Sequence, residues 1–123
     1  MILLDYRDKR PLYEQVIEKM IQLIAGGGLS PGDKLPSVRS LAMDLSVNPN
    51  TIQRAYNALE ADGYIYTVTG RGNYVADPEA WKQDHESALE QQLTEAVLQV
   101  RRSGLSKEQA LRCVENAFLE KDV

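Results

Sequence analysis

The sequence predicts a mainly α protein with one small β-hairpin, and three observations predict it. Apolar residues recur at helical spacing in five segments, whereas only the stretch from 64 to 75 combines aromatic and β-branched residues with a glycine-rich turn. The chain has 123 residues and 43% apolar content, which suits one domain, or a small domain with an appendage. No apolar run approaches the roughly 20 residues that a membrane helix needs. The chain can therefore bury a core, but only a small one.

The first predicted helix follows Pro11 and ends at the glycine triplet 26–28. Its apolar side chains recur at spacings of three and four residues and are Leu12, Val16, Ile17, Met20, Leu23 and Ile24. The loop LSPGDKLPS follows, with a Pro-Gly turn pair and a short segment before Pro36 that is expected to be extended.

Two further helices come in quick succession. Ser37 is a good N-cap for a short helix whose buried face is Val38, Leu41, Ala42 and Leu45. After Ser46 and Val47, Asn48 can cap a third helix, and Pro49 suits its first position. The inward face of this third helix is Ile52, Ala55, Tyr56 and Leu59. Two helices joined by so short a turn predict a helix-turn-helix.

A hairpin is predicted directly after the third helix, which Asp62 and Gly63 close. Residues 64–68 favour a strand, TGRG forms the turn, and residues 73–75 return as its partner. A hairpin in this place is the wing of a winged helix-turn-helix. Residues 1–76 are therefore predicted to form one such domain.

Residues 77–123 are predicted to form a short two-helix dimerisation segment. A composition shift with Pro78 marks its start, and Trp81 at the hinge is expected to be a packing anchor. A capping box begins the second helix at Ser106. The apolar stripes of the two helices contain Leu89, Leu93, Val97 and Val100, then Leu111, Val114 and Phe118. About 40 residues in two helices cannot enclose a core alone, so a second copy of the chain is the natural partner. A rival interpretation packs these helices on the chain's own first helix and leaves a monomer.

The sequence gives no sign of catalysis or of a cofactor. Its one cysteine, Cys113, is expected to be a buried apolar residue, and its one histidine leaves no cluster of metal ligands. No nucleophile-and-base set and no phosphate-binding glycine loop can be assembled. The N-terminus lacks the pattern of a secretion signal, so a cytoplasmic protein with no membrane association is expected.

The net charge of −4 is unevenly distributed. Residues 1–76 carry eight basic and eight acidic residues, whereas residues 77–123 carry six basic and ten acidic ones. The N-terminal part is neutral and has room for a basic face, so the charge permits DNA binding without demanding it.

The outer face of the third helix carries groups that can bind DNA bases. In a helix-turn-helix the second helix enters the major groove with its N-terminal residues against base edges. Asn50 and Gln53 can pair with adenine, and Arg54 with guanine or a phosphate. Thr51 can reach a phosphate or a thymine methyl group. Beyond this helix, the predicted contacts are the caps Ser37 and Asn48, the arginine Arg39, and the wing tip Gly70, Arg71 and Gly72.

Three stretches resemble the GntR family of bacterial transcription regulators: residues 31–42, PGDKLPSVRSLA; residues 47–56, VNPNTIQRAY; and residues 70–75, GRGNYV. The opening PLYEQ and the short helical tail resemble the YtrA-like subfamily. The resemblance implies a winged-helix DNA-binding domain, a homodimer formed through the C-terminal helices, and repression of operons that often encode ABC transporters. By this resemblance, Arg39 matches the family arginine that contacts DNA from the second helix, and Gly70 matches the wing-tip glycine. The residues that match recognition-helix positions are Asn50, Thr51, Gln53 and Arg54. Pro49 stands where other subfamilies place a DNA-contacting arginine, and Asn73 replaces a hydroxyl residue.

The leading hypothesis is a dimeric repressor that binds double-stranded DNA at an inverted repeat. The alternative is a winged-helix module that binds protein without DNA sequence specificity, because a fold does not dictate its function. No effector pocket can be identified from the sequence.

Overall fold

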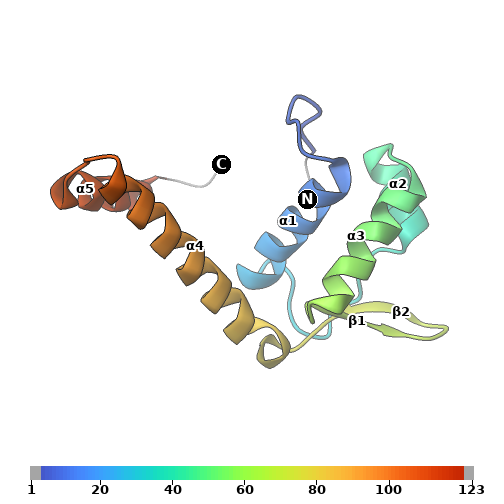
Figure 1. The fold of residues 1–123 in the computed structure, drawn as a ribbon. Coiled ribbons are helices and arrows are strands. Elements are labelled where there is room, and N and C mark those ends of the chain that lie inside the picture. The colour runs from blue at the N-terminus through green and yellow to red at the C-terminus, as the bar shows by residue number, and fades with distance from the viewer. Residues whose placement is uncertain (1–3, 121–123) are drawn as a thin grey trace. The chain divides into compact units, whose positions relative to one another are not determined.

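The computed structural model describes residues 4–120 and confirms the mainly helical fold with one antiparallel hairpin (Figure 1). The elements in chain order are α1 (Leu12–Ala25), α2 (Val38–Leu45), α3 (Pro49–Ala61), β1 (Ile65–Val68), β2 (Gly72–Val75), a 3-10 turn η1 (Pro78–Ala80), α4 (Lys82–Arg102) and α5 (Lys107–Leu119). Described residues up to Lys82 form one compact unit, unit 1, and those from Gln83 form a second, unit 2.

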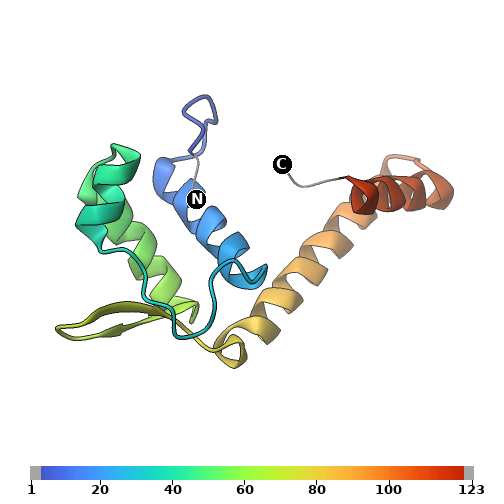
Figure 2. The ribbon, with the colours of Figure 1, turned by 180° about the vertical axis from the view of Figure 1, so that it is seen from behind.

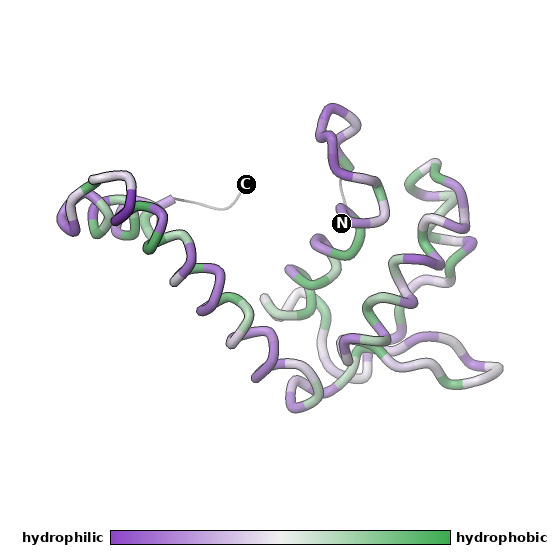
Figure 3. The backbone as a smooth tube through the Cα atoms, viewed as in Figure 1, coloured by the Kyte–Doolittle hydropathy of each residue, from purple (hydrophilic) through white to green (hydrophobic). Residues whose placement is uncertain are grey.

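Unit 1 is built around α3, which packs against α1, α2 and β1 (Figure 2). Each helix of this unit is amphipathic, and Figure 3 shows apolar and polar residues alternating along them. The buried core combines one face of each helix with the hairpin: Val16, Met20, Ile24, Leu41, Ala42, Ile52, Ala55, Tyr56, Leu59, Ile65 and Val75. This core holds α3 with its opposite face toward solvent.

The turn between α2 and α3 is formed by residues with special backbone preferences. Ser46 has a left-handed backbone with φ 57°, and the N–H of Val47 reaches back to the carbonyl of Ala42. Asn48 then caps α3, and Pro49 is its first residue, as expected. Local signals therefore fix this tight connection.

The hairpin pairs β1 with β2 from Ile65 opposite Val75 to Val68 opposite Gly72. The second strand thus begins at Gly72, one residue earlier than predicted. The loop before α2 runs along the other edge of β2: the N–H of Leu35 donates to the carbonyl of Asn73 at 2.8 Å. Both edges of β2 are therefore hydrogen-bonded, one to β1 and the other to the loop before α2.

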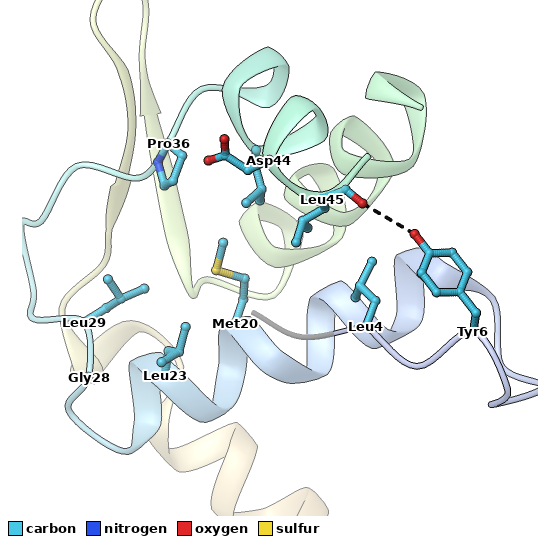
Figure 4. A pocket seen from close by; sticks show the side chains of 10 residues that line it. Leu4, Tyr6, Met20, Leu23, Gly28, Leu29, Pro36, Asp44 and Leu45 are labelled. Atoms are coloured by element: carbon cyan, nitrogen blue, oxygen red, sulfur yellow. Dashed lines mark hydrogen bonds between the residues drawn. The ribbon is translucent and has the colours of Figure 1, made fainter. Parts of the chain in front are cut away.

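The segment before α1 is attached to unit 1 by a buried glutamine that sequence analysis did not single out. Gln15 is only 3% exposed, and its side-chain amide exchanges hydrogen bonds of 2.8 and 3.0 Å with the backbone of Asp5. The hydroxyl of Tyr6 donates to the carbonyl of Leu45 at 3.4 Å (Figure 4). An apolar cleft of about 510 Å³ lies between this segment, α1 and α2. It is lined mainly by Leu4, Tyr6, Met20, Leu23, Leu29, Pro36, Leu41 and Leu45. Figure 4 shows most of these side chains pointing into the cleft. The N-terminal segment thus helps to hold α2 in place, in addition to the packing of α2 on α3.

Trp81 is the packing anchor that the sequence predicted. It is buried in the core of unit 1, and its ring centroid lies 5.1 Å from that of Tyr64. This contact attaches the residues after the hairpin to the core.

Unit 2 consists of the two predicted amphipathic helices. The capping box at Ser106 is present: its hydroxyl accepts from the N–H of Gln109, and the Gln109 side chain accepts from the N–H of Ser106. No residue of α4 or α5 is buried. The expectation that Cys113 is buried is therefore wrong for the single chain, where it is exposed. Among the described residues, nothing covers Cys113 enough to bury it.

Candidate nucleic-acid interface

The outer face of α3 is polar and open to solvent. Asn50, Gln53 and Arg54 are exposed, Thr51 is half-buried, and the apolar residues of the helix face the core. The side-chain amide of Gln53 donates to Oδ1 of Asn57 at 2.8 Å, which extends the polar face by a turn. Amide and guanidinium groups are those that pair with base edges in the major groove.

The two cap residues each keep a hydrogen-bond donor. Oγ of Ser37 accepts from the N–H of Ser40 at 3.0 Å, and Oδ1 of Asn48 accepts from the N–H of Asn50 at 2.8 Å. The hydroxyl hydrogen of Ser37 and the amide hydrogens of Asn48 are not used in capping. Arg39 is exposed in the first turn of α2. Both helix N-termini also favour anions through their dipoles and free N–H groups.

The wing tip requires glycine at two positions. Gly70, with φ 79°, is the third residue of a turn closed by the N–H of Arg71 donating to the carbonyl of Val68 at 2.9 Å. Gly72 has φ 131°, and a Cβ there would lie 3.0 Å from Cε of Lys34. The stem of Lys34, which sequence analysis did not assign to the site, therefore passes beside Gly72. A further cation therefore lies beside the start of β2.

Three arginines of this surface have no carboxylate partner among the residues that the structure describes. Arg39, Arg54 and Arg71 form no ion pair with any residue from 4 to 120. Arg10 differs, because it donates to the carboxylate of Asp8 at 2.7 Å, and this hydrogen bond lowers the pKa of Asp8. The charge of the three unpaired arginines is therefore available to phosphates.

Arg54 instead contacts an aromatic ring. Its guanidinium carbon lies 3.7 Å from the ring centroid of Tyr13, the second residue of α1. Around this pair is a shallow depression of about 370 Å³ lined by Pro11, Leu12, Tyr13, Asn50, Thr51 and Arg54. Tyr13 could not be assigned to this site from the sequence, because only the packing of α1 on α3 brings it there.

The structure places the predicted residues on three elements of unit 1. Asn50, Thr51 and Arg54 meet in the depression at the start of α3, whereas Arg39 lies on α2 and Arg71 at the hairpin tip. In both ribbon views α2, α3 and the hairpin lie on the same side of α1 (Figures 1 and 2). Within residues 4–120 there is no group of metal-ligating side chains, and no helix is long and apolar enough to cross a membrane.

Residues 12–75 match the model of a protein family described as bacterial regulatory proteins, gntR family. The chain belongs to this family. As a GntR-family protein it is a transcription regulator with a DNA-binding domain, not an enzyme.

Two relatives from Bacillus subtilis (strain 168) resemble this GntR protein. It is 49% identical over 77 residues to the HTH-type transcriptional repressor YtrA, a match that covers 63% of this chain and 59% of YtrA. It is 37% identical over 111 residues to the uncharacterized HTH-type transcriptional regulator YhcF, covering 86% of this chain and 88% of YhcF. The matched region thus spans about three fifths of the first relative and most of the second.

Two solved structures share the fold over all or part of their length. A GntR family transcriptional regulator from Listeria monocytogenes superposes with a TM-score of 0.78 at 37% identity, over 92% of this chain and 98% of that one. The DNA-binding domain of AraR in complex with operator ORE1 superposes with a TM-score of 0.53 at 32% identity, over 62% of this chain and 93% of that one. This second structure therefore contains a DNA-binding domain bound to DNA.

Proposed function

We propose that this GntR protein is a homodimeric repressor that binds an inverted-repeat operator. The observation that carries the dimer is the exposed apolar face of unit 2. Except for the half-buried Val100, the apolar side chains of its stripes are exposed, among them Leu93 at 57% and Phe118 at 87%. Contiguous apolar surface of this kind marks a protein interface.

A second copy of the chain suits this face. A groove of about 460 Å³ between α4 and α5 is lined chiefly by Leu93, Ala96, Val97, Val100, Ala110, Cys113 and Val114. A two-fold axis brings the same apolar face of two chains together, so each can cover the groove of the other. The acidic residues of 77–123 disfavour nucleic acid as the occupant. We assign dimerisation to residues 77–123 and DNA binding to residues 1–76.

In the proposed complex, α3 enters the major groove and α2 crosses the backbone. Asn50, Gln53 and Arg54 face base edges or nearby phosphates, and Thr51 supports them. The remaining contacts are phosphate contacts from Ser37, Arg39 and Asn48, and minor-groove contacts from Gly70, Arg71 and Gly72. Repression is proposed from the relation to YtrA, whose name describes a repressor. By the YtrA-like resemblance, we further propose an ABC-transporter operon as the target.

The oligomeric state tests the dimer. Light scattering on the eluting protein is expected to give the dimer mass for the wild type and the monomer mass for Leu93→Asp, because the charge would be buried at the interface. Gln91→Asp adds the same charge to an exposed position of α4 and is expected to stay dimeric. A wild type that elutes at the monomer mass across micromolar concentrations would contradict the proposal and favour the monomeric alternative.

DNA binding is tested by selecting random duplexes on the purified protein and sequencing the bound pool. An inverted repeat with half-sites about one helical turn apart is expected. The double variant Arg39→Ala, Arg54→Ala is expected to lose the enrichment, whereas Arg101→Ala, an exposed arginine of α4, is expected to keep it. Enrichment that survives the double variant would refute the assigned surface, and no enrichment by the wild type at low salt would favour a protein-binding module. Deleting the gene in its host should raise transcripts of the bound operon if the protein represses it.

A further inference from the structure

In the described part of the chain, Arg54 contacts an aromatic face and no carboxylate. Its guanidinium carbon lies 3.7 Å above the ring of Tyr13, which is half-buried at the start of α1. Tyr13 and Arg54 also share the depression with Asn50 and Thr51. The ring therefore lies against the part of α3 to which DNA contacts are assigned.

We propose that Tyr13 is a positioning residue for DNA binding, because its ring fixes Arg54 with the guanidinium edge free to donate to DNA. The inference rests on the proposed function and deepens it. A guanidinium carries five N–H donors in its plane, and stacking on a ring occupies only one face of that plane. Tyr13 can thus hold Arg54 without using the groups that bind DNA.

Arg10 shows the opposite arrangement in the same protein. Its Nε and both terminal nitrogens donate to the carboxylates of Asp8 and Glu18. An arginine held in this way has its donors engaged and its charge neutralised. Arg54 is held firmly while its donors remain available, which is the arrangement that a DNA contact requires.

Tyr13 increases the affinity for DNA because it orders the Arg54 side chain before DNA binds. A long, flexible side chain loses rotamer freedom when an interface immobilises it, and a side chain already held in place loses less. The stacking contact also favours the charged guanidinium near the ring face. Removing the ring is expected to weaken operator binding about 3- to 10-fold, where tenfold corresponds to about 1.4 kcal/mol.

The acceptor for Arg54 is either a base edge or a phosphate, and the measurements separate the two. If Arg54 reads a base, Tyr13→Leu should reduce discrimination at one operator position. If it binds a phosphate, Tyr13→Leu should weaken all sequences alike, and Arg54→Ala should reduce the slope of log affinity against log salt by about one. Either pattern agrees with the inference, since both need the same N–H edge.

The experiment measures affinity for the selected operator by fluorescence anisotropy. It compares the wild type with Tyr13→Leu, Tyr13→Phe, Arg54→Ala and the double variant Tyr13→Leu, Arg54→Ala. Tyr13→Leu and Arg54→Ala are each expected to weaken binding, while Tyr13→Phe, which keeps the ring, should stay within twofold of the wild type. In the Arg54→Ala background, Tyr13→Leu should cause no further loss, because no side chain remains to be positioned.

Four results would overturn the inference. Tyr13→Leu could leave operator affinity unchanged. It could instead reduce affinity by the same factor in the wild-type and Arg54→Ala backgrounds, in which case Tyr13 acts independently of Arg54. Tyr13→Phe could lose as much as Tyr13→Leu, in which case the hydroxyl acts. Arg54→Ala could bind like the wild type, in which case nothing is positioned although the proposed function stands. Failure of the wild type to bind any sequence would be the failure of the proposed function itself.

A measurement on the free protein guards against variants that fold poorly. In the stacked arrangement the ring current of Tyr13 shifts the Arg54 Hδ resonances upfield in the wild type, and ordinary resonance positions would overturn the inference without any variant. Urea unfolding followed by the fluorescence of Trp81 confirms that each variant used for binding keeps its core.

Discussion

Replacing Tyr56 by Phe removes a hydroxyl that connects α3 to the loop before α2. The hydroxyl donates to the carbonyl of Pro36 at 2.8 Å, and Tyr56 is only 2% exposed. Loss of a hydrogen bond with a partly buried acceptor costs about 1 to 3 kcal/mol. Pro36 lies at the surface, where water can partly replace the lost donor. We therefore expect the free energy of unfolding to fall by about 1 to 1.5 kcal/mol at pH 7.

The same hydroxyl makes stability depend on alkaline pH. Burial raises the pKa of Tyr56 from 10.0 to about 12. Between these values the unfolded chain loses the proton and the folded chain keeps it, so the unfolded state binds fewer protons and stability falls as pH rises. The slope approaches about 1.4 kcal/mol per pH unit, or about 3 kcal/mol over the whole window. Below pH 10 this contribution is fully present. Tyr56→Phe lacks the contribution, so its deficit at pH 7 should disappear near pH 11.

Trp81 provides the assay, because it is the only tryptophan of the chain and is buried in the core of unit 1. Urea midpoints of its fluorescence should be measured for both proteins at pH 7, 9, 10.5 and 11.5. The matched control is Tyr66→Phe, since Tyr66 is 44% exposed on the hairpin and should change stability by less than about 0.5 kcal/mol.

Two results would refute this reasoning. If Tyr56→Phe and the wild type unfold at the same urea concentration at pH 7, the hydrogen bond to Pro36 makes no net contribution. If their midpoints fall in parallel above pH 10, the titration of Tyr56 does not govern the alkaline loss of stability.

Three further predictions can be tested by urea unfolding and by operator binding. Ser37→Ala should lower stability by about 1 kcal/mol, because the N–H of Ser40 loses its cap, whereas Ser37→Gly should cost only a few tenths; urea unfolding compares them. Gly63→Ala should be more destabilising than Gly70→Ala in the same assay. Both positions have positive φ, but a Cβ at Gly63 would lie 2.8 Å from the carbonyl oxygen of Ala80, and one at Gly70 meets nothing within 4 Å. Operator affinity should fall about 10- to 1000-fold between 50 and 200 mM salt, depending on how many phosphates are bound, and a salt-independent affinity would contradict phosphate binding.

Much of the fold could be predicted from sequence because its signals are local. Helical periodicity and the caps at Ser37, Asn48 and Ser106 located three of the helices, and glycine located the hairpin turn. These signals depend on a residue and its neighbours within one or two turns. The positions proposed on α3 could be named for the same reason, since a helix with a known inner face has a known outer face.

Contacts between distant segments could not be predicted in this way. Gln15 looks like a surface residue in sequence, but its amide is buried against the backbone of Asp5. Nothing near Lys34 indicates that its stem lies beside Gly72. Such contacts depend on how one element packs on another, and no single segment carries that information.

The sequence by itself determined where the helices and the hairpin lie and which faces are apolar, because periodicity, capping and turn preferences act within a few residues. Only the tertiary structure decided which of those apolar faces are covered. The faces of α1, α2 and α3 meet in one core, whereas those of α4 and α5 stay exposed and leave Cys113 open to solvent. The tertiary structure also decided that Tyr13 meets Arg54, since burial and side-chain pairing depend on which elements pack together.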